Sequence, residues 1–118
     1  MSDIGIEVKE FNGEGYAPLI SYNGWRVAIA NFCERLRENN ICKVERHLKT
    51  DEVFILLEGS ASLFMGEDAR EVVMEKFLSY VVKKSAWHNI VVSEDARVLI
   101  VENKNTGKHN SEYLPFKL

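Results

Sequence analysis

Turn-forming residues interrupt this chain at short intervals, and their spacing limits the length of any element it can form. Asn and Gly tolerate a positive backbone φ, so Asn-Gly pairs mark tight hairpins. The chain has two such pairs, Asn12-Gly13 and Asn23-Gly24, and both are predicted to form hairpins. Further breaks fall at residues 38–40, 48–51, 58–59, 66–68, 93–95 and 103–107. The segments between them are too short for most α-helices.

The segments between the breaks are rich in Val, Ile, Leu and aromatic residues, which favours β-strands. Residues 28–37 and 69–77 also have helical spacing. We interpret the first as a strand ending in a turn. For the second, the sequence does not decide between a strand and a helix. About eight to ten short strands with regular turns are typical of an antiparallel all-β sandwich or barrel. The clearest predicted strands are residues 16–22, 25–33, 41–47, 52–57, 60–65, 78–82, 87–92 and 97–102.

Length and charge exclude several classes of protein. With 118 residues and 46% apolar residues, the chain is expected to form one domain over residues 1–118. Fifteen basic against 18 acidic residues give a net charge of −3, which argues against nucleic-acid binding. No segment is long and apolar enough to span a membrane, and the first residues lack the pattern of a secretory signal. A cytoplasmic location is therefore expected, with Cys33 and Cys42 as buried thiols.

The residues with the most chemistry lie around one turn. Glu45 and His47 are two apart in a predicted strand, so their side chains share a face. The turn at residues 48–51 should bring Glu52 back beside them, and a later strand contributes His88. Two imidazoles and a carboxylate can bind a divalent ion. Each residue also has an ordinary explanation as a solvated charge or a barrel histidine hydrogen-bonded to the backbone.

This region resembles the first motif of the cupins, in which histidines and a glutamate precede a glycine. Four residues separate His47 from Glu52, and six separate Glu52 from Gly59, as in that motif. His88 resembles the histidine of the second cupin motif. The resemblance covers about residues 25–103 and implies a cupin barrel, that is, an antiparallel double-stranded β-helix or jelly roll.

The chain also departs from both cupin motifs. Glu45 stands where the family usually has its first histidine, and Asn39 replaces the leading glycine. In the second motif, residues other than the usual glycine, proline, glycine and asparagine stand at four positions, Phe77, Lys83, Ser85 and Val92.

The resemblance implies a metal site of His47, Glu52 and His88 for Fe, Mn, Zn, Ni or Cu. Glu45 is then a fourth ligand, a catalytic general base or an acceptor that orients a histidine. Three functions remain open. One is a metal-dependent isomerase, lyase or oxygenase acting on a small polar molecule. Another is a non-catalytic barrel that binds a sugar or metabolite without metal. The third is a partner-binding protein that uses exposed strand edges and Trp87.

Strand alternation extends the predicted site. It places Phe54 and Leu56 beside Glu52, and Ile90 beside His88, on the face of the cavity. Arg26 could hold an anionic ligand, on a strand expected beside residues 41–47. His109 is expected in a surface loop. Exposed strand edges predict a homodimer, whose interface candidates are Trp25, Trp87 and the outward side chains of residues 72–77.

Overall fold

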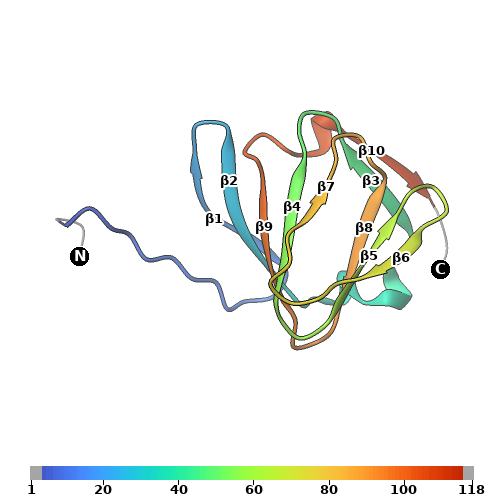
Figure 1. The fold of residues 1–118 in the computed structure, drawn as a ribbon, viewed down its shortest axis with the longest axis horizontal. Coiled ribbons are helices and arrows are strands. Elements are labelled where there is room, and N and C mark those ends of the chain that lie inside the picture. Colours follow the sequence, from blue (N-terminus) through green and yellow to red (C-terminus); the bar gives the residue numbers. More distant parts are fainter. Residues whose placement is uncertain (1–3, 116–118) are drawn as a thin grey trace.

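The computed structural model describes residues 4–115 and consists of short strands joined by turns (Figure 1). Single-turn 3₁₀ helices are the other regular elements of this part of the chain. They are η2 (Glu34–Leu36), η3 (Glu38–Asn40) and η4 (Lys108–Asn110). The strands are β1 (Tyr16–Tyr22), β2 (Trp25–Asn31), β3 (Lys43–His47), β4 (Glu52–Glu58), β5 (Ala61–Met65), β6 (Arg70–Val73), β7 (Tyr80–Val82), β8 (His88–Val92), β9 (Arg97–Asn103) and β10 (Ser111–Pro115).

The strands form two five-stranded sheets that face each other (Figure 1). The first sheet has the order β1-β2-β9-β4-β7, and the second has the order β10-β3-β8-β5-β6. Every strand pair within these sheets is antiparallel. The prediction of an antiparallel all-β barrel is therefore confirmed. Segment 28–37 is a strand followed by a turn, as expected, and segment 69–77 contains the short strand β6.

Alternating side chains on β4 and β9 build the interior. On β4 every second residue from Glu52 to Leu56 is buried, and on β9 every second residue from Val98 to Glu102 is buried. Both strands lie in the first sheet and pair with each other, so these faces point together toward the second sheet. Leu56 and Val98 are fully buried at the centre of the core. At one end of the same face, each strand carries a glutamate instead of an apolar residue.

The two Asn-Gly pairs behave differently. Asn23 has a φ of 54° and turns β1 into β2, as predicted. The hairpin predicted at Asn12-Gly13 is wrong, because these residues form a bend ahead of β1. The Asn31 side chain fixes that bend by donating hydrogen bonds to the carbonyls of Phe11 and Gly13 at 3.1 and 2.8 Å. The carbonyls of this bend thus accept hydrogen bonds from a side chain of β2 and not from the backbone of a partner strand.

Two positions where cupin motifs carry glycine keep a glycine-like backbone. Phe77 and Ser85 both have a φ of 68°, in the left-handed region that ordinary residues avoid. This conformation costs a non-glycine residue about 1–2 kcal/mol. Both positions therefore have a backbone conformation that glycine adopts more readily than Phe or Ser.

The expected pair of buried thiols is wrong. Cys42 is exposed, and Cys33 is partly buried against the core. Ile41, the neighbour of Cys42, is buried and takes the inward position before β3, which turns the cysteine outward. Both cysteines are free. Within residues 4–115, the structure has no helix with the length and hydrophobicity that a bilayer crossing requires.

Candidate functional site

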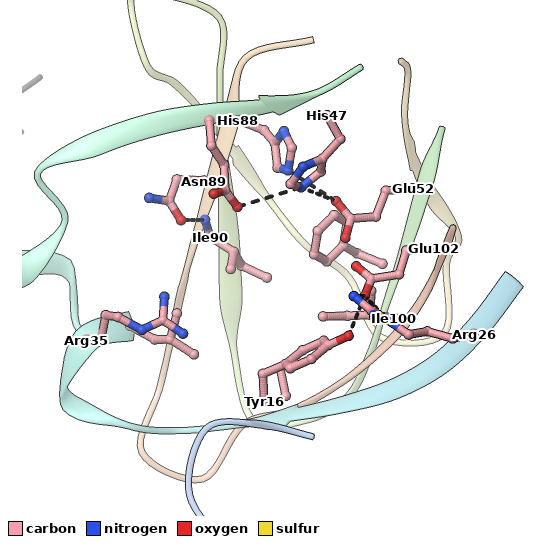
Figure 2. Close-up of a pocket in the computed structure, with 14 residues that line it drawn as sticks. Tyr16, Arg26, Arg35, His47, Glu52, His88, Asn89, Ile90, Ile100 and Glu102 are labelled. Atoms are coloured by element: carbon pink, nitrogen blue, oxygen red, sulfur yellow. Dashed lines mark hydrogen bonds and ion pairs between the residues drawn. The ribbon is translucent and has the colours of Figure 1, made fainter. Parts of the chain in front are cut away.

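A cavity of about 230 Å³ opens between the two sheets (Figure 2). One part of its wall is polar and contains imidazoles, carboxylates and arginines, whereas the remainder is apolar. Both sheets contribute, as does η2. Its lining residues are Tyr16, Arg26, Ala30, Arg35, Leu36, Glu45, His47, Glu52, Phe54, His88, Asn89, Ile90, Ile100 and Glu102.

Two histidines and Glu52 meet at one end of this cavity. Glu52 Oε1 lies 3.3 Å from His47 Nε2 and 3.2 Å from His88 Nε2. The ring centroids of the two histidines are 5.1 Å apart. All three side chains are largely buried. Glu52 Oε1 is fully buried and has no hydrogen-bond partner among the described residues.

Hydrogen bonds to the opposite ring nitrogens fix both imidazoles. His88 Nδ1 lies 3.0 Å from the Ala86 carbonyl, which can only accept, so this nitrogen carries the proton. His47 Nδ1 lies 2.7 Å from Ser111 Oγ, whose own hydrogen is donated to the Gly107 carbonyl at 2.7 Å. His47 Nδ1 is therefore also a donor. In their neutral forms, both histidines therefore have an unprotonated Nε2 close to Glu52.

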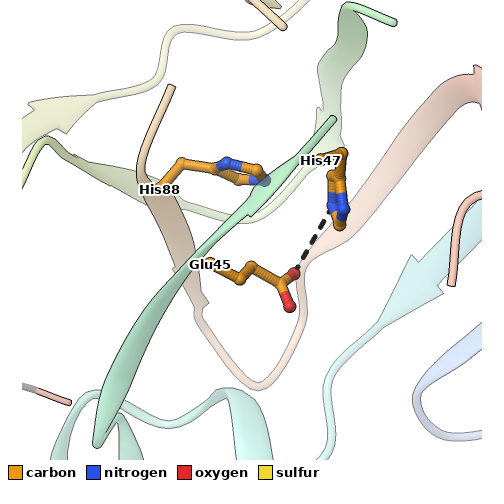
Figure 3. A group of neighbouring side chains, drawn as sticks. All are labelled: Glu45, His47 and His88. Atoms are coloured by element: carbon orange, nitrogen blue, oxygen red, sulfur yellow. Dashed lines mark ion pairs between the residues drawn. The ribbon is translucent and has the colours of Figure 1, made fainter. Parts of the chain in front are cut away.

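Glu45 approaches the same histidines from the cavity (Figure 3). Its Oε1 lies 3.7 Å from His47 Nε2, and Glu45 pairs with His88 across β3 and β8. One donor atom from each of Glu45, His47 and His88 lies within 4.8 Å of the other two, a spacing that can hold a metal ion. The Glu45 side chain is about one-third exposed, more than Glu52, and so borders the open part of the cavity.

The surroundings shift the pKa values of this cluster in opposite directions. Burial alone would raise the pKa of Glu52, but the adjacent imidazoles hold it well below its ordinary range. Burial lowers the pKa of His47, and the Glu52 and Glu45 carboxylates more than offset this, so its pKa is raised overall. The cluster therefore favours an anionic carboxylate beside a positive charge.

A second buried glutamate, Glu102 of β9, lies beside Glu52 on the adjacent strand (Figure 2). The Tyr16 hydroxyl donates to Glu102 Oε2, and Arg26 Nε donates to the same oxygen at 2.7 Å. Burial and the neighbouring Glu52 carboxylate raise the pKa of Glu102 to about 7. Burial and Glu102 likewise raise the pKa of Tyr16. The Tyr16 hydroxyl and the Arg26 Nε–H are thus both directed at Glu102.

The structure places the remaining predicted site residues as follows. Phe54 and Ile90 line the cavity. Leu56 shares the inward face of β4 but lies deeper, in the packed core, and is not part of the cavity wall. Trp87 is partly buried outside the cavity, where the Arg46 guanidinium covers its ring at 4.4 Å. The side chain of His109 is exposed, as expected for a surface loop.

The expectation for Arg26 is corrected in two respects. Its strand, β2, lies between β1 and β9, whereas residues 43–47 belong to the other sheet. Its guanidinium is also already engaged, because Nη1 donates to the Lys104 carbonyl at 3.0 Å and Nη2 to the Thr106 carbonyl at 3.1 Å. With Nε bound to Glu102, little of Arg26 is left for an anionic ligand.

Several polar residues at the site were not predicted from the sequence. Glu102 had a readable signal, because it continues the inward alternation of Val98 and Ile100 on an apolar strand. Ser111 had none, since its role depends on β10 pairing with β3, which aligns it opposite His47. The others, Tyr16, Arg35 and Asn89, are brought to the cavity by the packing of the sheets and η2.

Comparison with known proteins identifies the fold. No family model and no curated protein sequence matches the chain, but solved structures do. A cupin-2 domain protein from Shewanella frigidimarina is 22% identical, with 80% of this chain and 85% of that chain covered and a TM-score of 0.58. Streptomyces Pac13, described as a nucleoside dehydratase, is 11% identical, with 92% and 85% covered and a TM-score of 0.64.

A third structure, HppE with Fe(II), is 17% identical and has a TM-score of 0.58, with 87% of this chain and 58% of that chain covered. All three are cupin-fold proteins. The chain therefore has the cupin fold that its motifs resemble. Cupins carry out different chemistry on the same barrel, so the function has to be argued from the site.

Proposed function

We propose that this protein binds a divalent transition-metal ion through His47, His88 and Glu52 and receives a small polar molecule in the adjoining cavity. One observation carries the proposal. The unpartnered Glu52 Oε1 lies within 3.3 Å of Nε2 of both histidines, and it forms a hydrogen bond with neither. A buried acceptor without a donor is costly, and a cation satisfies all three atoms at once.

The donor set fits such an ion. Each imidazole donates its Nδ1 hydrogen to a fixed acceptor, the arrangement that orients metal-binding histidines in proteins. Two histidines and a carboxylate favour Fe(II) and also accept Mn, Zn, Ni or Cu. A bound ion would supply a Lewis acid that polarises an oxygen of the substrate.

In this proposal Glu45 is the catalytic base. It borders the open cavity and is not held by an arginine or lysine among the described residues, so its carboxylate can accept a proton from a bound molecule. Phe54 and Ile90 form the apolar wall against which that molecule packs. Isomerisation, lyase chemistry and oxidation all remain compatible with these residues.

The structural neighbours are in keeping with a ligand in the barrel. Pac13 is named as a nucleoside dehydratase, and variants of it have been solved with uridine. HppE has been solved with Fe(II). Their low identity to this chain gives no argument for the same substrate or the same metal here.

A second candidate is a binding module that works without metal. A proton on either imidazole would also satisfy Glu52 Oε1, leaving a neutral or weakly charged pocket for a sugar or metabolite. The observation in its favour is that Glu45 replaces a nitrogen donor at one corner of the cluster, which weakens binding of ions that prefer imidazole.

Metal analysis of protein purified without added metal separates the two candidates. The metal proposal expects stoichiometric transition metal that is lost in His88→Ala and kept in His109→Ala, whose histidine is exposed. Protein that remains metal-free after incubation with Fe(II), Mn(II) and Zn(II) would contradict the proposal and favour the binding module.

We also propose that the protein is a homodimer. Val73 and Phe77, on and just after β6, are 67% and 71% exposed, and Trp25 is 44% exposed. Apolar surface of this kind is commonly covered by a second subunit. Sedimentation should give a dimer at micromolar concentration, and Phe77→Glu should shift it to monomer. A monomeric wild-type protein would contradict this proposal.

A further inference from the structure

Two arginines, Arg26 and Arg35, line the cavity, and they differ in their hydrogen-bond partners. Arg26 donates to Glu102 and to the carbonyls of Lys104 and Thr106. Arg35 has no hydrogen bond or ion pair with any residue of the described chain. Figure 2 shows Arg35 across the cavity from Arg26 and Glu102. The guanidinium of Arg35 is therefore the one of the two whose N–H groups can still donate to a ligand.

The short helix η2 contributes two residues to the cavity wall, the charged Arg35 and the apolar Leu36. Leu36 is 5% exposed and belongs to the hydrophobic core. Arg37 bonds to Glu34 with both Nε and Nη2, at 3.0 and 3.2 Å, and lies near Glu94. Arg37 does not line the cavity. Arg35 precedes both of these residues, and it is the charged residue of η2 that lines the cavity.

The charges around the cavity define where an anion can bind. Glu45, Glu52 and Glu102 make the histidine end and the Arg26 side acidic. In the metal-free protein, a carboxylate or phosphate on a ligand is repelled there and attracted to Arg35, whose guanidinium can bind either group in a bidentate manner.

The volume and wall of the cavity limit the remainder of the ligand. About 230 Å³ is smaller than the roughly 300–1,000 Å³ of most ligand pockets, so a short molecule fits. Ile90 and Ile100 line the wall with apolar side chains. A ligand with an anionic group at one end and a hydroxyl or carbonyl oxygen at the other matches this distribution.

We propose that Arg35 is the anion-binding residue of the cavity. It binds the carboxylate or phosphate of a short-chain hydroxy or oxo acid, whose far oxygen reaches the cluster of His47, His88 and Glu52. This inference rests on the proposed function for the far end of the ligand. The anion-binding role of Arg35 itself needs no metal and can be tested in the metal-free protein.

The test is an NMR titration that follows the Arg35 Nε–H signal. The probes are 3-hydroxybutyrate and glycerol 3-phosphate, with 3-hydroxybutyramide and glycerol as their neutral counterparts. The acids should shift the signal and the neutral compounds should not, and Arg35→Gln should weaken acid binding about 10-fold or more. The more effective acid identifies the preferred anion as carboxylate or phosphate.

Arg37→Gln is the matched control, because it removes the same charge two residues away outside the cavity and should leave acid binding unchanged. Equal losses in the two variants would reduce the effect to general electrostatics and overturn the inference. Acids that fail to shift the Arg35 signal would overturn it as well.

Co²⁺ binding, followed by visible absorption, separates this inference from the proposed function. Arg35→Gln should bind Co²⁺ as the wild type does. Normal Co²⁺ binding without Arg35-dependent acid binding contradicts this inference alone. Arg35-dependent acid binding without any Co²⁺ binding supports Arg35 and contradicts the metal proposal.

Discussion

Glu52 and Glu102 are two glutamates at equivalent depth on adjacent strands, and their surroundings differ. They are 6% and 7% exposed and sit on the same inward face of the first sheet. Glu102 accepts hydrogen bonds from a tyrosine and an arginine. Glu52 faces two imidazole nitrogens, and its Oε1 has no hydrogen-bond partner. Glu102 is therefore paired within the fold, whereas Glu52 Oε1 is the atom that we propose binds an ion.

The largest effect that distinguishes the two glutamates should be on stability. Glu102→Ala removes the acceptor of Arg26 and Tyr16 and leaves a largely buried arginine without its carboxylate. We expect a loss of about 3 kcal/mol in the free energy of unfolding, measured by urea denaturation. Glu112→Ala is the control, because its pair with Arg46 is at the surface and should contribute less than about 1 kcal/mol. Similar losses in both variants would contradict a structural role for Glu102.

Glu52→Gln should have the opposite profile, with little change in stability and a large change in metal binding. The carboxamide can donate to the imidazole lone pairs, so the metal-free variant should stay within about 1 kcal/mol of wild type. It removes the anionic ligand atom, so Co²⁺ affinity should fall about 100-fold, or about 2.7 kcal/mol. Calorimetric Co²⁺ titration measures this, with Glu71→Gln on the outer β6 as control. Unchanged affinity would remove Glu52 from the site.

Ser111→Ala tests whether the orientation of the imidazoles belongs to the same site. Without Ser111 Oγ, His47 loses the acceptor of its Nδ1 hydrogen, and loss of such an orienting partner costs about 10-fold or more in metal affinity. The control is Ser62→Ala, whose hydroxyl instead donates to Glu71. If the two variants bind Co²⁺ equally well, the orientation of His47 by Ser111 does not matter for the metal.

The smallest effect should come from Arg26→Lys. Lysine keeps a positive charge near Glu102 but loses the bonds from the guanidinium to the Lys104 and Thr106 carbonyls. We expect a loss of about 1 kcal/mol in stability, seen as a lower urea midpoint. Arg35→Lys should leave the midpoint unchanged, because Arg35 has no polar partner within residues 4–115. A larger effect at Arg35 than at Arg26 would reverse the assignment of structural and ligand-binding arginines.

The replacement of glycines in the second cupin motif shows that a missing motif residue need not mean a different backbone conformation. Phe77 and Ser85 stand where the second cupin motif usually has glycine. The chain nevertheless keeps the left-handed conformation at both positions. A strain of about 1–2 kcal/mol per residue is small beside the burial that holds the two sheets together, so the fold tolerates residues that the local conformation disfavours.

The sequence by itself determined the strand pattern and the central cluster. Turn residues set the strand limits, and the two-residue period of strands placed Glu45 and His47 on one face and Phe54 beside Glu52, all of which depends only on neighbours along the chain. For the same reason it misplaced Leu56, because alternation gives the face of a side chain but not its depth between the sheets.

Only the tertiary structure decided which charged groups have hydrogen-bond partners within the protein and which are left to bind a ligand. Arg26 and Arg35 look alike in the sequence, but strand pairing brings Glu102 to the first and leaves the second facing the cavity. Ser111 orients His47 because β10 pairs with β3 from more than sixty residues away. Partners so distant in the chain are set by the packing of whole sheets, and a local pattern carries no record of that packing.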